Sequence, residues 1–157
     1  MPVQHLPEST YLLPVLPAAI DPPAVEVRTG SALVELGFPS PAEDFEDDSL
    51  DLNRLIVRNA PATFFYRASG NSMILAGICD GDLLAVDRSV TVQDGDTVFA
   101  TWDGNAPCCK ILRILGDHVE LHSANPRHAA IVFPPGAEVE VFAVVGVARS
   151  LRRVRAR

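Results

Sequence analysis

Ser72 and Lys110 are the two residues of this 157-residue chain whose types and surroundings suggest catalysis. Ser72 lies in the run Ala68-Ser69-Gly70-Asn71-Ser72-Met73, a glycine-containing bend that follows the strand-like segment 63–68. Lys110 is the only lysine, and the other twelve basic residues are arginines. Arginine keeps its proton near neutral pH, whereas a buried lysine can lose it. A serine nucleophile activated by a neutral lysine is therefore the chemistry to consider first.

Lys110 lies in a segment, 108–114, that follows an Asp103-Gly104-Asn105 turn signal and is predicted to be a strand. Strand alternation places Cys108, Lys110, Leu112 and Ile114 on one face and Cys109, Ile111 and Arg113 on the other. Burial among apolar neighbours lowers the pKa of a lysine and makes it a usable base.

Ser72, on its bend, can present both its hydroxyl and its backbone N–H, and this N–H is the predicted donor to the oxyanion. The residues alone leave a second interpretation open, in which Ser72 is only a turn residue and the single lysine reflects an arginine-rich composition.

Three motifs decide between these interpretations. They are Gly37-Phe38-Pro39-Ser40-Pro41-Ala42, the run at 68–73, and Gly77-Ile78-Cys79-Asp80-Gly81-Asp82-Leu83-Leu84-Ala85-Val86-Asp87. In this order they resemble the LexA/UmuD family of self-cleaving serine–lysine peptidases, over about residues 36 to 148. The resemblance implies that Ser72 is the nucleophile. It also implies a basic lysine on a later strand, in a pattern like Val-Lys-(Lys/Arg)-Leu.

The run Cys109-Lys110-Ile111-Leu112 matches that lysine pattern when one extra residue is placed in the turn at 105–107. An ungapped alignment would instead put Cys109 at the lysine position. We predict Lys110 because a turn accepts an insertion more easily than a strand accepts a shift of register. The chain also has no second lysine to offer.

The resemblance places the scissile bond at Leu36–Gly37. The family has alanine or cysteine before the cut, so Leu36 must fit a site built for a smaller side chain. The resemblance further implies a homodimer, a RecA–single-stranded DNA filament as activator of cleavage, and a processed form, 37–157, that serves a UmuC-like Y-family translesion polymerase after DNA damage. The alternative is a dimeric binding subunit that cleaves weakly or not at all and regulates the polymerase.

Composition limits the remaining possibilities. The net charge of −7 argues against strong direct binding of duplex DNA. The chain lacks an uninterrupted apolar stretch of about 18 residues and a basic amino-terminal region, so we expect no membrane span and a cytoplasmic location. Three cysteines suit a reducing compartment. No cofactor or metal is predicted, because Asp80 and Asp82 lack a third ligand nearby and the four histidines show no metal-binding spacing.

The predicted architecture is mostly β: a LexA/UmuD-like, partly closed sheet with an extended amino-terminal arm and one short helix. The arm, 1–36, is rich in proline and contains a strand-like segment at 24–28. The peptidase domain spans 37–150 and is followed by a basic tail, 151–157, for a nucleic acid or an acidic partner or for solubility alone. Ser49 is predicted to cap a helix that runs to about Ala60. Strands are predicted at 63–68, 83–87, 97–102, 108–114, 118–123, 130–133 and 139–149.

Overall fold

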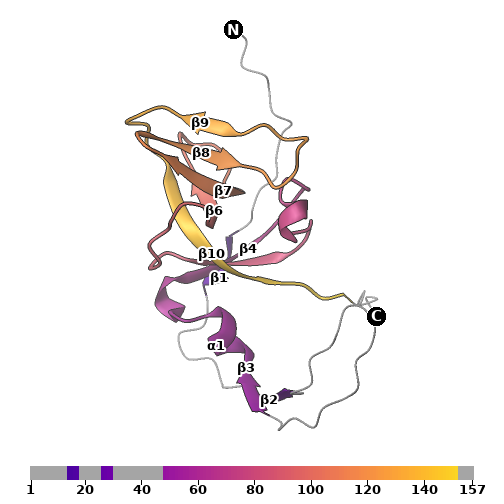
Figure 1. Cartoon of the computed structure of the whole chain (residues 1–157). Coiled ribbons are helices and arrows are strands. Elements are labelled where there is room, and N and C mark those ends of the chain that lie inside the picture. Colours follow the sequence, from indigo (N-terminus) through magenta and orange to yellow (C-terminus); the bar gives the residue numbers. More distant parts are fainter. Residues whose placement is uncertain (1–13, 18–25, 30–47, 152–157) are drawn as a thin grey trace.

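The computed structural model describes residues 14–17, 26–29 and 48–151 (Figure 1). The strands in this part of the chain are β1 (Pro14–Pro17), β2 (Glu26–Thr29), β3 (Asp48–Asp51), β4 (Thr63–Arg67), β5 (Leu83–Asp87), β6 (Thr97–Thr101), β7 (Cys108–Leu115), β8 (His118–His122), β9 (Ile131–Phe133) and β10 (Glu140–Ala148). The helices are α1 (Leu52–Ile56) and the short 3-10 helices η1 (Ala60–Ala62) and η2 (Ile74–Ala76).

Eight strands form one antiparallel sheet in the order β1-β4-β5-β10-β6-β7-β8-β9. The long strand β10 joins its two halves, because residues 140–143 pair with β6 whereas 143–148 pair with β5. Figure 1 shows β10, in yellow, running between β6–β9 and the layer of β4 and β5. The predicted mostly-β class is confirmed, and the sheet is open, with β1 and β9 at its edges.

The predicted start of the helix is wrong. Ser49 does not cap it, because Ser49 lies in β3 and pairs with Arg28 of β2. The cap is Asp51, whose carboxylate accepts a hydrogen bond from the backbone N–H of Asn53 at 2.9 Å. The helix then ends at Ile56, well before Ala60. Ile56 packs on β10, where a Cβ added to Gly146 would lie 3.0 Å from the Ile56 side chain.

The arm contributes two short strands. The strand-like segment predicted at 24–28 appears as β2, which pairs with β3 in a separate two-stranded sheet. The second strand, β1, pairs antiparallel with β4 at the edge of the large sheet. Prolines at both ends of β1 suit an edge position, since proline cannot donate to a sheet ladder. None of the helices in the described ranges is long and apolar enough to cross a membrane.

The interior is built from three apolar clusters. The first, around Val98, Leu112 and Leu121, fills the space between β6, β7 and β8. The second contains Tyr66 and Phe99, whose ring centroids lie 4.4 Å apart. The third joins Met73, Ile78 and Leu84, with Cys109 and Ile111 packed against it. This third cluster fixes the segment that follows Ser72 onto the sheet.

Candidate active site

The segment that carries Ser72 is a tight bend between β4 and η2. Gly70 has φ +87° and Gly77, at the end of η2, has φ +78°, a left-handed conformation that glycine adopts without strain. Ser72 itself is half-buried, and the next residue, Met73, is buried in the core. Within residues 14–17, 26–29 and 48–151, neither the hydroxyl nor the backbone N–H of Ser72 forms a hydrogen bond. Both groups are therefore available to a substrate carbonyl.

The Asp80-Gly81-Asp82 turn holds this bend from one side. Asp80 accepts a hydrogen bond from the Gly70 N–H at 2.8 Å. Two backbone bonds complete the attachment, from Gly81 N–H to the Ala68 carbonyl at 2.8 Å and from Ala68 N–H to the Asp82 carbonyl at 2.7 Å. The turn therefore anchors the part of the bend that precedes Ser72.

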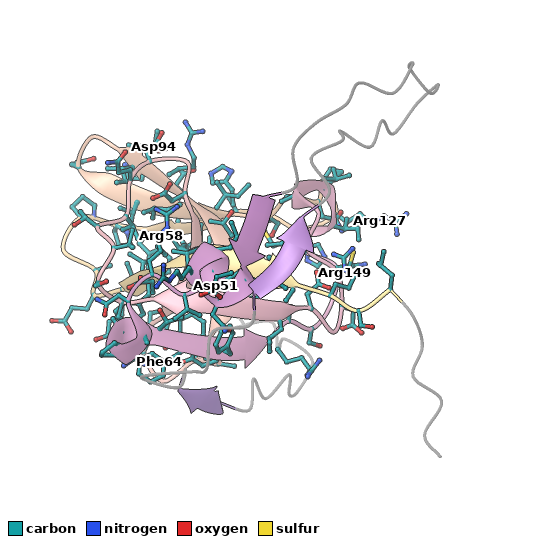
Figure 2. All side chains as sticks on the ribbon, turned by 90° about the horizontal axis from the view of Figure 1, so that it is seen from below. Asp51, Arg58, Phe64, Asp94, Arg127 and Arg149 are labelled. Atoms are coloured by element: carbon teal, nitrogen blue, oxygen red, sulfur yellow. The ribbon has the colours of Figure 1, made fainter. Side chains whose placement is uncertain are left out.

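Arg149, which is labelled in Figure 2, lies just beyond β10. Its side chain holds the same turn in place. Its guanidinium donates to both carboxylate oxygens of Asp82, at 2.5 and 2.6 Å, and to the Gly77 carbonyl at 2.7 Å. The Asp82 side chain is buried, and its hydrogen bonds with Arg149 lower its pKa. This role of Arg149 was not predicted from the sequence, because Arg149 adjoins the basic run at the carboxyl end.

The segment after β8 supports the bend from the other side. The buried amide of Asn125 donates to the Asn71 carbonyl at 3.0 Å, and its oxygen accepts from the Arg127 N–H at 3.0 Å. The ring of His128 lies 3.0 Å from the Asn71 amide oxygen. The Leu75 N–H donates to the Ala124 carbonyl at 2.9 Å. Ser72 thus lies in a bend with its neighbours fixed at both ends.

A cavity of about 180 Å³ opens beside Ser72. Its lining residues are Ala68, Ser69, Gly70, Ser72, Met73, Ile78, Cys79, Leu84, Pro107, Cys108 and Cys109. All three cysteines of the chain contribute to this lining. Most of the wall is apolar, and Ser72 contributes a hydroxyl that can act as a nucleophile.

Strand β7 presents different residues to its two sides, as alternation predicted. Lys110 pairs with Val98 and shares the face of the first apolar cluster. Cys109 pairs with Phe99 and packs, with Ile111, against the Met73 cluster. The residue of this pair that the structure brings to the Ser72 cavity is therefore Cys109. Lys110 is absent from the residues that line that cavity.

The amine of Lys110 is directed elsewhere, to the hydroxyl oxygen of Ser123 at 3.0 Å. Lys110 is half-buried, and this desolvation lowers its pKa, as the sequence predicted. The neighbouring thiols are affected in the opposite direction. Burial raises the pKa of Cys108, and burial together with the adjacent Cys108 raises the pKa of Cys109 to about 12. Both thiols are therefore neutral at physiological pH.

Comparison with known proteins places this arrangement in a family. The model of the family described as Peptidase S24-like matches residues 29–146, which is well over half of the chain. The chain belongs to the Peptidase S24-like family. The resemblance to the LexA/UmuD group that the motifs indicated is confirmed.

Several relatives share the matched part. Protein ImpA of Salmonella typhimurium is 49% identical over 78 residues, which is 50% of this chain and 54% of ImpA. Protein SamA of Salmonella typhimurium is 38% identical over 109 residues, 69% of this chain and 74% of SamA. LexA repressor 1 of Geobacter sulfurreducens is 35% identical over 123 residues, 77% of this chain and 60% of the repressor. The chain spans about half the length of ImpA, the first of these relatives.

The remaining predicted residues of this S24-like chain fall in two groups. Leu36 and Gly37, the expected cleavage site, lie outside the described residues. Asp80 and Asp82 are engaged by Gly70 and Arg149, and no group of three potential metal ligands occurs in the described ranges.

Two histidines lie on β8 and share one carboxylate. The rings of His118 and His122 lie 3.4 and 2.6 Å from Glu120. Hydrogen bonds with Asp117 and Glu120 raise the pKa of His118, while the bond with His122 lowers that of Glu120.

Proposed function

We propose that this protein is a UmuD-like SOS-response protein that cleaves itself between Leu36 and Gly37, with Ser72 as nucleophile and Lys110 as base. One observation carries the proposal: in a chain of the S24-like family, Ser72 lines an apolar cavity on a bend that is fixed from both sides, and its hydroxyl forms no hydrogen bond to any residue that the structure describes. The lowered pKa of Lys110 supports its role, because a lysine that is neutral at moderate pH can accept the serine proton.

The reaction would proceed in two stages. Lys110 takes the proton from Ser72 Oγ, and this oxygen attacks the carbonyl carbon of Leu36. The developing oxyanion accepts a hydrogen bond from the backbone N–H of Ser72. The C–N bond then breaks as the Gly37 amine leaves with the proton from Lys110. Water hydrolyses the resulting acyl-serine ester, which restores Ser72 and leaves a carboxylate on Leu36.

This mechanism sets one structural requirement. The Lys110 amine must exchange its hydrogen bond with Ser123 for one with Ser72. We propose that this exchange accompanies entry of the arm into the site, and that a RecA–single-stranded DNA filament promotes it by favouring the arm-bound state. Cleavage would remove residues 1–36 and leave 37–157 as the mature chain in the cytoplasm.

In this proposal the mature chain, as a homodimer, is the accessory subunit of a UmuC-like Y-family translesion polymerase. Similarity to ImpA, SamA and MucA supports it; MucA of Escherichia coli is 48% identical over 67 residues, 43% of this chain and 46% of MucA. The net charge of −7 supports a protein partner over direct contact with duplex DNA.

Intact-mass spectrometry of the purified chain over a pH series tests the cleavage. We expect a fragment that begins at Gly37, that forms faster at alkaline pH, and that is absent from Ser72→Ala and Lys110→Ala. A chain that remains uncut at every pH, even with an activated RecA filament, would exclude the self-cleaving function.

A second candidate function is a dimeric binding subunit that regulates the polymerase without efficient cleavage. The position of Cys109 favours it, because the cavity beside Ser72 is lined by the neutral Cys109 and not by Lys110. In that case Ser72→Ala would leave damage-induced mutagenesis unchanged in cells, whereas the self-cleaving protein would lose it.

A further inference from the structure

The cavity beside Ser72 has the properties of a side-chain recognition pocket. Its inner wall consists of Met73, Ile78 and Leu84, all of them buried. Cys108 and Cys109 also line the cavity, and both thiols are neutral because burial raises their pKa. Neutral thiols of this kind pack as small, mostly apolar groups and react only through the small fraction that ionises. The cavity therefore suits an uncharged aliphatic group.

The size of the cavity defines which group it can hold. A volume of about 180 Å³ is large for a methyl group. An apolar cavity of about 150 Å³ is known to accept benzene, which has six heavy atoms. The isobutyl group of leucine has four heavy atoms and fits the available space. Small residues at Ala68, Cys108 and Cys109 keep this space open, since a larger side chain at any of them would fill it.

We propose that this cavity is a specificity pocket for a branched aliphatic side chain, and that its occupant is Leu36 of the chain's own arm. The inference rests on the proposed function, because an acyl group attacked by Ser72 must place its side chain beside that serine. It accounts for the one departure from the family motif at the cleavage site: the larger residue before the cut is matched by a cavity walled with small thiols.

The test measures pocket occupancy without requiring cleavage. In the full chain carrying Ser72→Ala, the rate at which N-ethylmaleimide modifies Cys108 and Cys109 is followed by peptide mass spectrometry. We expect Leu36 to protect both thiols, so that Leu36→Asp raises their modification rates by about tenfold, since a buried leucine is strongly favoured over an aspartate in an apolar site. The matched control is Leu33→Asp, which puts the same charge in the same arm and should leave the rates unchanged.

The outcomes separate this inference from the proposed function. Equal modification rates with Leu36 and Leu36→Asp would overturn the pocket assignment, whether or not the Ser72 chain cleaves. Protection by Leu36 in a protein whose Ser72 form is never cut would uphold the pocket and refute the cleavage. If the chain cleaves itself, we expect the cleavage rate of Leu36→Asp to be at least tenfold lower than that of the parent. The cleavage rate of Leu36→Ile should be close to that of the parent. A cleavage rate that does not change with the residue at position 36 would also refute the pocket assignment.

Discussion

The amine of Lys110 donates a hydrogen bond to the Ser123 hydroxyl across 3.0 Å, whereas the neighbouring Cys109 lines the Ser72 cavity. The only lysine of the chain is therefore hydrogen-bonded to the hydroxyl of Ser123 and not to that of the candidate nucleophile, Ser72. Two predictions address which of the neighbouring positions, 109 or 110, governs cleavage.

If Lys110 is the base, the cleavage rate rises with pH through the pKa of Lys110. Burial places this pKa below the ordinary lysine value of roughly 10.4. Lys110→Ala should slow cleavage by about 10²-fold or more. Ser123→Ala should move the midpoint of the pH–rate profile to lower pH, because the ammonium form loses the acceptor that favours it. The measurement is the rate of appearance of the Gly37 fragment by intact mass.

The matched control is Ser123→Thr, which keeps the hydroxyl and should keep the midpoint. A midpoint that stays in place in Ser123→Ala, together with unimpaired cleavage in Lys110→Ala, would remove Lys110 from the mechanism.

Placing an amine at position 109 tests the ungapped alignment, in which residue 109 takes the place of the catalytic lysine. Cys109→Lys introduces a lysine among the residues that line the Ser72 cavity, where the apolar surroundings would lower its pKa. Because the long side chain takes the space that Leu36 needs, we expect Cys109→Lys and Cys109→Met both to slow cleavage by about tenfold or more. In Lys110→Ala, where the proposed base is gone, adding Cys109→Lys should leave cleavage slow. A Lys110→Ala chain that is accelerated about 10²-fold by Cys109→Lys, and not by Cys109→Met, would place the base at 109 and refute both the role of Lys110 and the pocket.

The sequence predicted much of the sheet because alternation and turn signals are local. The predicted strand 83–87 has the bounds of β5, and 108–114 differs from β7 by one residue. The same alternation assigned Cys109 and Lys110 to opposite faces. Which face the Ser72 bend covers could not be predicted, because it depends on the packing of Ile111 against the cluster that contains Met73, and these residues are far apart in the chain.

The start of helix α1 and the role of Arg149 also could not be predicted, because both depend on contacts between residues that are far apart in the chain. Ser49 is a good capping residue, but its backbone pairs with the distant Arg28, and Asp51 takes the cap instead. Arg149 adjoins a run of arginines that suggested a tail. Its partner, Asp82, lies 67 residues earlier, and only the pairing of β10 with β5 brings the two together.

Arg149→Met should destabilise the fold and loosen the Ser72 bend, because it leaves the buried Asp82 carboxylate without its partner and frees the Gly77 carbonyl. We expect the melting temperature at neutral pH to fall by several degrees, and cleavage to slow. The control is Arg113→Met, which removes an ion pair with Asp94 in which both side chains are half-exposed. Exposed pairs contribute little, so this variant should melt close to the parent.

The pH dependence of this effect has a defined sign. Arg149 lowers the pKa of folded Asp82 below the ordinary value of roughly 3.9. The stabilisation is therefore fully present above that ordinary value and is lost as the pH falls through the folded pKa. Melting temperatures recorded from neutral pH down to about pH 3 should converge for the parent and Arg149→Met. A constant difference across this range would mean that the Asp82 charge is not what Arg149 stabilises.

Asn125 provides the matching test on the other side of the bend. Its amide donates to the Asn71 carbonyl, while its oxygen accepts from the Arg127 N–H. Asn125→Asp keeps the acceptor for Arg127 but turns a carboxylate oxygen toward the Asn71 carbonyl. Because the site is buried, we expect a loss of about 1–3 kcal/mol in the free energy of unfolding at neutral pH, measured by urea denaturation.

Cleavage in Asn125→Asp should also slow, since the backbone next to Ser72 loses its support. His128→Ala, which removes only an exposed contact with Asn71, should change stability by less than about 0.5 kcal/mol. If Asn125→Asp were as stable as His128→Ala and equally active, the segment after β8 would not be what holds the nucleophile in position.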